Sequence, residues 1–155
     1  MKNQKLFNRT VDILVKALKE GKLEHGDCQK CAVGNIVTSN MYGGVDGLIT
    51  GAWYHPVACT TWNTERLMQE IEDEGKFSEY SDLSYKTTLM QIMSTGYTIE
   101  ELRRIESAFE DANQGPDGEY DSTGVYGLRN VYDELLRIHD VDITAELATA
   151  EEVFA

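Results

Sequence analysis

Proline and long apolar runs are scarce in this 155-residue chain. Only two prolines are present, and no window approaches the roughly 20 apolar residues that a bilayer-spanning helix requires. The first 21 residues also lack an uninterrupted apolar stretch, because Asp12 and Lys16 break it, so no secretory signal peptide is expected. The sequence therefore predicts a cytoplasmic protein that is neither inserted in nor anchored to a membrane.

Cysteine is also rare, and its number is odd. Three cysteines fit reduced cytosolic thiols better than a framework of extracellular disulfides. A globule of this length buries roughly 70% of its unfolded surface, which suffices for a core without cross-links. The hydrophobic content of 41% and the charged content of 26% are ordinary for a folded protein, so we expect one domain over residues 1–155.

No lysine follows Lys86, and the charge is unevenly distributed. Residues 1–95 carry ten Lys or Arg and twelve Asp or Glu, a balance of −2, whereas residues 96–155 carry four and fifteen, a balance of −11. Nucleic-acid backbones bind clustered positive charge, so the acidic part is not expected to bind DNA or RNA directly. The acidity indicates either a solubilising surface or a surface that docks onto a basic protein partner.

Apolar spacing predicts helices along most of the chain. Phe7, Val11, Leu14 and Leu18 form one stripe that Gly21 would end. A second helix is expected from Cys28 to about Ser39, with Asp27 as its N-cap. Five further helices are expected at about residues 63–74, from 81 or 82 to 95, at 99–112, along the apolar face Leu128, Val131, Tyr132, Leu135 and His139, and at 144–153.

The strongest local signal precedes the helix at 99–112. Thr98 and Glu101 have the spacing of a capping box, and Tyr97 and Leu102 occupy the two positions of a hydrophobic staple. The polar stretch that follows, residues 113–124, is predicted to be a solvated turn, because it lacks the bidentate Glu of a calcium loop.

Residues 41–62 are the least helical part of the chain. Four glycines fall between residues 43 and 51, and Pro56 removes a backbone donor from the aromatic stretch that follows. The sequence as a whole therefore predicts an all-α compact bundle of about seven helices with an irregular Gly/aromatic-rich segment at 41–62. If the chain has a functional site, we expect it there, beside the second helix.

Two pairs of metal-ligating side chains flank the glycine-rich segment. Cys28 and Cys31 are three positions apart, and His55 and Cys59 are four apart, which supplies the four ligands that tetrahedral zinc requires. His25 could replace one of them. Alternatively the cysteines pack on the apolar face of a helix. A redox role for the CxxC pair is a third interpretation, although the βαβ context of thioredoxin-like motifs is missing. Zinc is the one cofactor that the sequence suggests.

Two other functional hypotheses remain. Cys59 could act as a nucleophile with His55 as its base, in a small cysteine-dependent enzyme, although no orienting group is evident. The hypothesis that the charge pattern favours is instead a non-enzymatic interaction or regulatory protein. Its partner would meet the acidic side chains of the C-terminal helices, namely Glu100, Glu101, Glu106, Asp133 and Glu134.

Three stretches carry a resemblance to known proteins: GDCQKCAVGNIV at 26–37, TGYTIEELRRIESAFE at 95–110 and GLRNVYDELLRIH at 127–139. Together they resemble an uncharacterised group of short helical proteins found in bacteria and their phages. The resemblance spans most of residues 26–139 and implies a bacterial or phage-type cytoplasmic context. It implies no reaction, and it assigns no role to any residue.

Zinc binding can be tested directly by native mass spectrometry. If Cys28, Cys31, His55 and Cys59 hold a structural zinc ion, the folded chain carries one ion per molecule and loses it on chelation. Its melting temperature then falls, because metal binding contributes to the free energy of folding. A mass and a melting temperature that chelation leaves unchanged would remove the zinc hypothesis.

Overall fold

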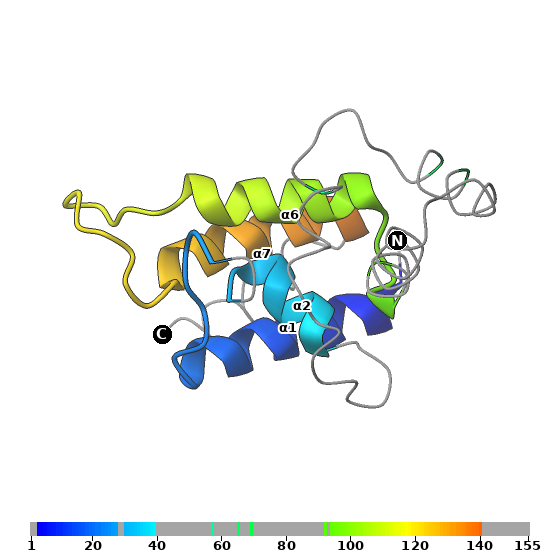
Figure 1. Cartoon of the computed structure of the whole chain (residues 1–155), viewed down its shortest axis with the longest axis horizontal. Helices are drawn as coiled ribbons and strands as arrows, with labels where there is room; N and C mark the ends of the chain where they lie inside the picture. Colours follow the sequence, from blue (N-terminus) through cyan, green and yellow to red (C-terminus); the bar gives the residue numbers. More distant parts are fainter. Residues whose placement is uncertain are drawn as a thin grey trace, which may run out of the picture. The chain divides into compact units, whose positions relative to one another are not determined.

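The computed structural model describes residues 3–27, 30–39, 57, 65, 69, 92 and 94–140. These residues form four helices and no strands, in agreement with the predicted all-α class (Figure 1). The helices are α1 (Gln4–Lys19), α2 (Ala32–Ser39), α6 (Ile99–Asp111) and α7 (Val125–His139). None of them is long and apolar enough to span a bilayer. Most of the irregular segment 41–62 and of the predicted helices at 63–74 and 81–95, and all of the helix at 144–153, lie outside the described residues, so the helix count of seven stays a prediction.

The chain divides into two compact units. One comprises residues 1–36 and 104–155, and the other comprises residues 37–103. The division falls within α2 and within α6, and the prediction of a single domain remains untested. The side chains of the candidate site described below belong to the first unit.

Helix α1 ends where its sequence predicts, and a side-chain cap marks its start. The Asn3 side chain accepts a hydrogen bond from the backbone N–H of Leu6 at 3.1 Å, which caps the first turn. Gly21 has a φ of 69°, the left-handed conformation that commonly follows a helix. The buried face is Phe7, Thr10, Leu14 and Ala17, slightly rotated from the predicted stripe. The hydroxyl of Thr10 can lie inside because it donates to the Leu6 carbonyl at 2.8 Å.

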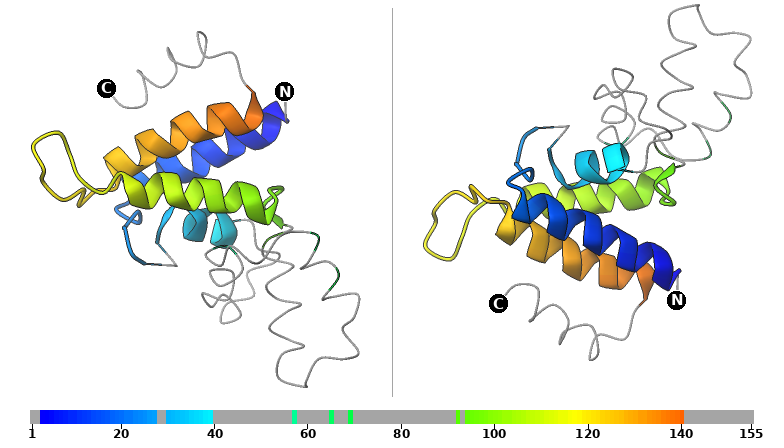
Figure 2. Two further views of the ribbon diagram at one scale, coloured as in Figure 1. Left: turned by 90° about the horizontal axis from the view of Figure 1, so that it is seen from above. Right: turned by 90° about the horizontal axis from the view of Figure 1, so that it is seen from below.

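Helix α7 lies antiparallel to α1 (Figure 2). The Phe7 ring meets Tyr132 edge-on at 5.9 Å and His139 at 5.4 Å, measured between ring centroids. All five residues of the predicted apolar face of α7 are buried, with at most 3% of their surface exposed. The 3.6-residue period therefore identified this face correctly.

Helix α6 begins with the predicted capping box. The backbone N–H of Thr98 donates to Glu101 Oε1 at 2.9 Å, and the N–H of Glu101 donates to Thr98 Oγ1 at 3.1 Å. Tyr97 and Leu102, the two residues of the staple, are 4% and 0% exposed. The capping box is therefore confirmed, and both residues of the predicted staple are buried.

The C-terminal half of α6 packs against α7 through polar contacts as well as apolar ones. The Asn130 side-chain amide donates to the Ala108 carbonyl at 2.6 Å. Glu134 accepts from Arg104 Nε at 2.6 Å and from Arg137 Nη1 at 2.8 Å. These bonds fix how the two helices face each other over this half of α6.

Helix α2 begins later than predicted. Lys30 and Cys31 form a turn in which the Asp27 carbonyl accepts from both N–H groups, at 3.0 and 2.7 Å, and the regular helix starts only at Ala32. The Lys30 carbonyl is meanwhile bound by the N–H of Glu24 at 2.8 Å. The predicted start at Cys28 was therefore too early, because local periodicity does not reveal that this backbone bonds to the preceding loop.

Candidate functional site

The loop between α1 and α2 inserts one imidazole into the helical unit. His25 leaves only 4% of its side chain exposed. Its ring stacks on Phe109 of α6 with the centroids 4.1 Å apart and the planes 14° from parallel. A polar ring in such a position requires hydrogen-bonding partners, since burying an unpaired polar group costs free energy.

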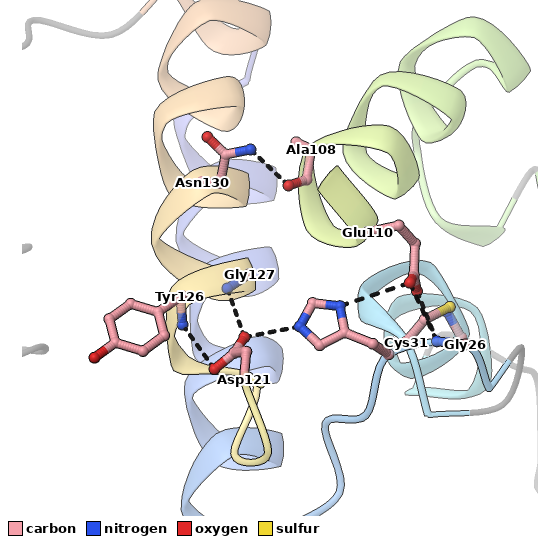
Figure 3. A network of polar contacts seen from close by, with 10 residues as sticks. Gly26, Cys31, Ala108, Glu110, Asp121, Tyr126, Gly127 and Asn130 are labelled. Carbon is pink, nitrogen blue, oxygen red and sulfur yellow. Dashed lines mark hydrogen bonds and ion pairs between the residues drawn. The ribbon is translucent and has the colours of Figure 1, made fainter. Parts of the chain in front are cut away.

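Asp121 supplies the first partner of His25. Its carboxylate is 1% exposed, and Oδ2 lies 2.7 Å from His25 Nε2 (Figure 3). The same carboxylate accepts from the backbone N–H groups of Tyr126 and Gly127, at 3.2 and 2.9 Å. These are the second and third residues of α7, whose N-cap position is occupied by Gly124 without a side chain. Asp121 therefore caps α7 from outside the usual position and lies where the helix dipole stabilises negative charge.

Gly127 is required for this arrangement. A Cβ atom at position 127 would lie 2.6 Å from ring atoms of Phe109 and 2.8 Å from His25 Cε1. Both rings are held by other contacts and cannot give way easily. The first turn of α7 can approach the stacked rings only because residue 127 has no side chain.

Glu110 of α6 faces the other side of the imidazole. Its two carboxylate oxygens each lie 3.1 Å from the backbone N–H of Gly26, next to His25 in the loop. Oε2 also lies 3.6 Å from His25 Nδ1, too far for a hydrogen bond but close enough for an ion pair when the ring is protonated. His25 Nδ1 is buried and has no hydrogen-bond partner.

Cys31 and Glu106 form a second buried polar pair nearby. The Cys31 thiol is fully buried, accepts from the N–H of Gly34 at 3.3 Å, and is hydrogen-bonded to the Glu106 carboxylate. Burial raises the pKa of Cys31 far above its usual range, and the charge of Glu106 raises it further. Burial likewise raises the pKa of Glu106 to about 7, although the thiol hydrogen bond opposes this. A thiol in this environment stays protonated and is not activated as a nucleophile.

Only one of the four residues predicted to bind zinc is described. Cys31 lies beside Glu106, while Cys28, His55 and Cys59 lie outside the described residues. Among the residues that the structure does describe, no group of three His, Cys, Asp or Glu side chains is placed to hold a metal ion. Zinc binding and the cysteine-dependent enzyme built on Cys59 both stay predictions.

The five acidic residues predicted to meet a partner differ in their surroundings. Asp133 is exposed on α7, whereas Glu134 is 16% exposed and bound to two arginines. Glu106 contacts Cys31 inside the first unit. Glu101 caps α6, and Glu100 beside it is partly buried.

Sequence reasoning did not identify the centre of this site. The sequence suggests His25 only as a substitute zinc ligand, and it gives no indication of the roles of Asp121, Glu110 and Gly127. A standard capping aspartate occupies the N-cap position, whereas Asp121 lies three residues before the N-cap Gly124, so its capping role has no standard sequence signal. No sequence signal links it to His25, because 96 residues separate the two.

The arrangement of these groups favours a structural role. An Asp–His pair can orient a general base, but here the second ring nitrogen faces Glu110 and the ring is enclosed by Phe109 and α7. The network instead ties the α1–α2 loop to α6 and to the start of α7. A scan against family models and searches of curated proteins and of solved structures found no match for the chain.

The network is tested by removing the Asp121 carboxylate. Asp121→Ala leaves His25 Nε2 and two N–H groups of α7 without an acceptor, so we expect a loss of about 2–4 kcal/mol in the free energy of unfolding. Asp121→Asn keeps one acceptor and should lose less. Asp133→Ala, an exposed aspartate on α7, is the matched control and should change stability by less than about 0.5 kcal/mol. Urea unfolding followed by circular dichroism measures all three, and an Asp121→Ala variant as stable as the control would contradict the role assigned to Asp121.

The raised pKa of Glu106 predicts a pH dependence of stability. The carboxyl group binds its proton with a pKa of about 7 in the folded chain and 4.5 in the reference state, so folding favours the protonated form. The unfolded chain therefore binds fewer protons between these values, and stability falls as the pH rises through this window. Glu106→Gln, which mimics the protonated acid, should remove this part of the fall.

Urea titrations at pH 5 and pH 8 measure the effect. We expect Glu106→Gln to gain stability relative to the wild type on going from pH 5 to pH 8, by an amount on the order of 2 kcal/mol. Asp133→Asn removes an exposed carboxylate from α7 and should show no such gain. If the two variants respond equally to pH, the Glu106 carboxyl group does not titrate as described.

Proposed function

We propose that this chain is a small non-enzymatic interaction or regulatory protein of bacterial or phage type, which acts in the cytoplasm by binding a basic protein partner. The observation that carries the proposal is the charge of residues 96–155, where fifteen acidic residues face only four arginines and no lysine. Such an imbalance produces a negative field that attracts a basic surface and accelerates its association.

The exposure of the carboxylates supports the proposal. In the part of the first unit that follows residue 104, Asp111, Asp117, Glu119, Asp133 and Asp140 are exposed. Arg104 and Arg137 both bind Glu134, which is not one of these five. Glu119 Oε2 also accepts from the Asp117 N–H at 3.1 Å. Exposed charges at the rim of an interface set the rate and the salt dependence of binding.

The buried polar groups are consistent with a role in binding. The His25–Asp121 contact and the Cys31–Glu106 contact hold the loop and helices together. A surface held in one conformation loses little entropy on binding, which favours affinity. These groups would then serve the interaction by keeping the acidic surface in place.

The proposal is tested by capturing partners and measuring their salt dependence. The immobilised chain is exposed to a bacterial lysate, captured proteins are identified by mass spectrometry, and the dissociation constant of each is measured with purified protein. We expect a basic partner whose affinity falls at least tenfold between 50 and 500 mM salt, because the Debye length shrinks from above 10 Å to a few Å.

Charge-reduced variants separate this attraction from other contacts. The triple variant Asp117→Asn, Glu119→Gln, Asp133→Asn removes three exposed carboxylates and should weaken binding at low salt. The matched double variant Lys16→Gln, Lys19→Gln removes two exposed lysines of α1 and should leave binding unchanged or tighter. Salt-insensitive binding, or capture of no basic protein, would overturn the proposal.

A further inference from the structure

The segment between α6 and α7 presents an exposed aromatic ring. Tyr120 is 60% exposed, and among the described residues no other large hydrophobic side chain is exposed. In Figures 1 and 2 this segment projects beyond the ends of the two helices that it joins. Single exposed apolar residues are common on protein surfaces, so the ring becomes informative only through what holds it and what surrounds it.

A tight hairpin holds Tyr120. The N–H of Asp121 donates to the Asn113 carbonyl at 2.8 Å, and the N–H of Gly115 donates to the Glu119 carbonyl at 2.7 Å. The turn is closed by Gly118 N–H donating to the Gly115 carbonyl at 3.0 Å, with Gly118 itself at a φ of 80°. Residues 113–121, called here the Tyr120 hairpin, therefore form a defined structure.

The Tyr120 hairpin is also anchored to the helices at both ends of its turn. Asp121 is fixed by His25 and by the start of α7, and the Tyr120 ring meets the buried His25 ring edge-on at 5.9 Å. At the other side, a Cβ atom on Gly115 would lie 2.7 Å from the ring of Tyr126, so hairpin and helix pack closely. Folding of the chain already orders the hairpin around Tyr120. Binding therefore loses less conformational entropy than it would with a flexible loop.

The sequence on either side of this ring carries charge of one sign, whereas Arg129 of α7 lies over the neighbouring Tyr126 ring, 5.9 Å from its centroid. Residues 105–128 contain six Asp or Glu and no Lys or Arg. Three of the six, namely Asp111, Asp117 and Glu119, are exposed in or next to the hairpin. An aromatic face flanked by carboxylates attracts a cationic side chain twice, through the ring quadrupole and through direct charge pairing.

We propose that the Tyr120 hairpin is the docking element for an arginine- or lysine-bearing segment of a partner protein, with the cationic group over the exposed face of Tyr120 and near the carboxylates of Asp117 and Glu119. This inference rests on the proposed function and assigns it to one surface. A nucleic acid does not fit that surface, since its phosphates would be repelled.

The test is a titration of the isotopically labelled full chain with a defined probe, a twelve-residue peptide of alternating Gly and Arg. We expect amide chemical-shift changes centred on residues 113–121 at 20 mM salt. A peptide with Gln in place of Arg should produce none. Tyr120→Ser should weaken binding about fivefold, and Tyr120→Phe, which keeps the ring, should bind as the wild type does.

Each other outcome overturns the inference in a distinguishable way. Shifts around Asp133 with an affinity that Tyr120→Ser leaves unchanged would place binding elsewhere and leave the proposed function standing. Equal shifts with the Gln peptide would exclude recognition of a cation. Hairpin shifts that depend on protein concentration without peptide would identify a second copy as the occupant. No shift at any amide at 20 mM salt would overturn the inference and count against the proposed function as well.

Discussion

The hydrogen bond between His25 and Asp121 joins segments that lie 96 residues apart in the chain. Asp121 also accepts from two N–H groups of α7, so one carboxylate satisfies both an inserted imidazole and a helix start. Neither group could remain in the interior alone, because each would be a buried polar group without a partner. The start of α7, the position of the α1–α2 loop and the stacking on Phe109 all depend on this bond.

Its surroundings explain why the arrangement is specific. Glu110 binds the Gly26 N–H beside the imidazole, and Gly127 gives the rings the space they need. A large side chain at position 127 or an apolar one at position 121 would remove the fit of all three segments. Buried polar networks of this kind favour one arrangement over others, because partly satisfied alternatives cost more than they would in water.

The buried pair of Cys31 and Glu106 shows that burying polar groups in this unit is unfavourable for their charged forms. Burial disfavours the charged form of both groups, and Glu106 Oε2 has no hydrogen-bond partner. Protonation of the carboxyl group relieves the penalty, which links the stability of the unit to pH near neutrality. The same burial keeps the thiol protonated, so Cys31 contributes packing and a hydrogen bond.

The interior and the surface thus have different parts in the proposed activity. Inside, the His25 network fixes the base of the Tyr120 hairpin; outside, the hairpin presents an aromatic ring among carboxylates. A rigid acidic surface is suited to recognising a basic partner, since charge complementarity provides association rate and specificity, and order provides affinity. The charge pattern alone suggests binding to a basic partner, and we propose the Tyr120 hairpin as the surface that binds it.

Local patterns in the sequence determined the helical class, the apolar face of α7 and the capping box at Thr98 and Glu101, because these depend on residues a few positions apart. The start of α2 was misplaced, since the backbone near Cys31 bonds to the preceding loop. Only the tertiary structure brought His25 to Asp121 and turned Glu106 toward Cys31. These contacts join distant segments, and neither periodicity nor composition carries information about which distant groups will meet in the interior.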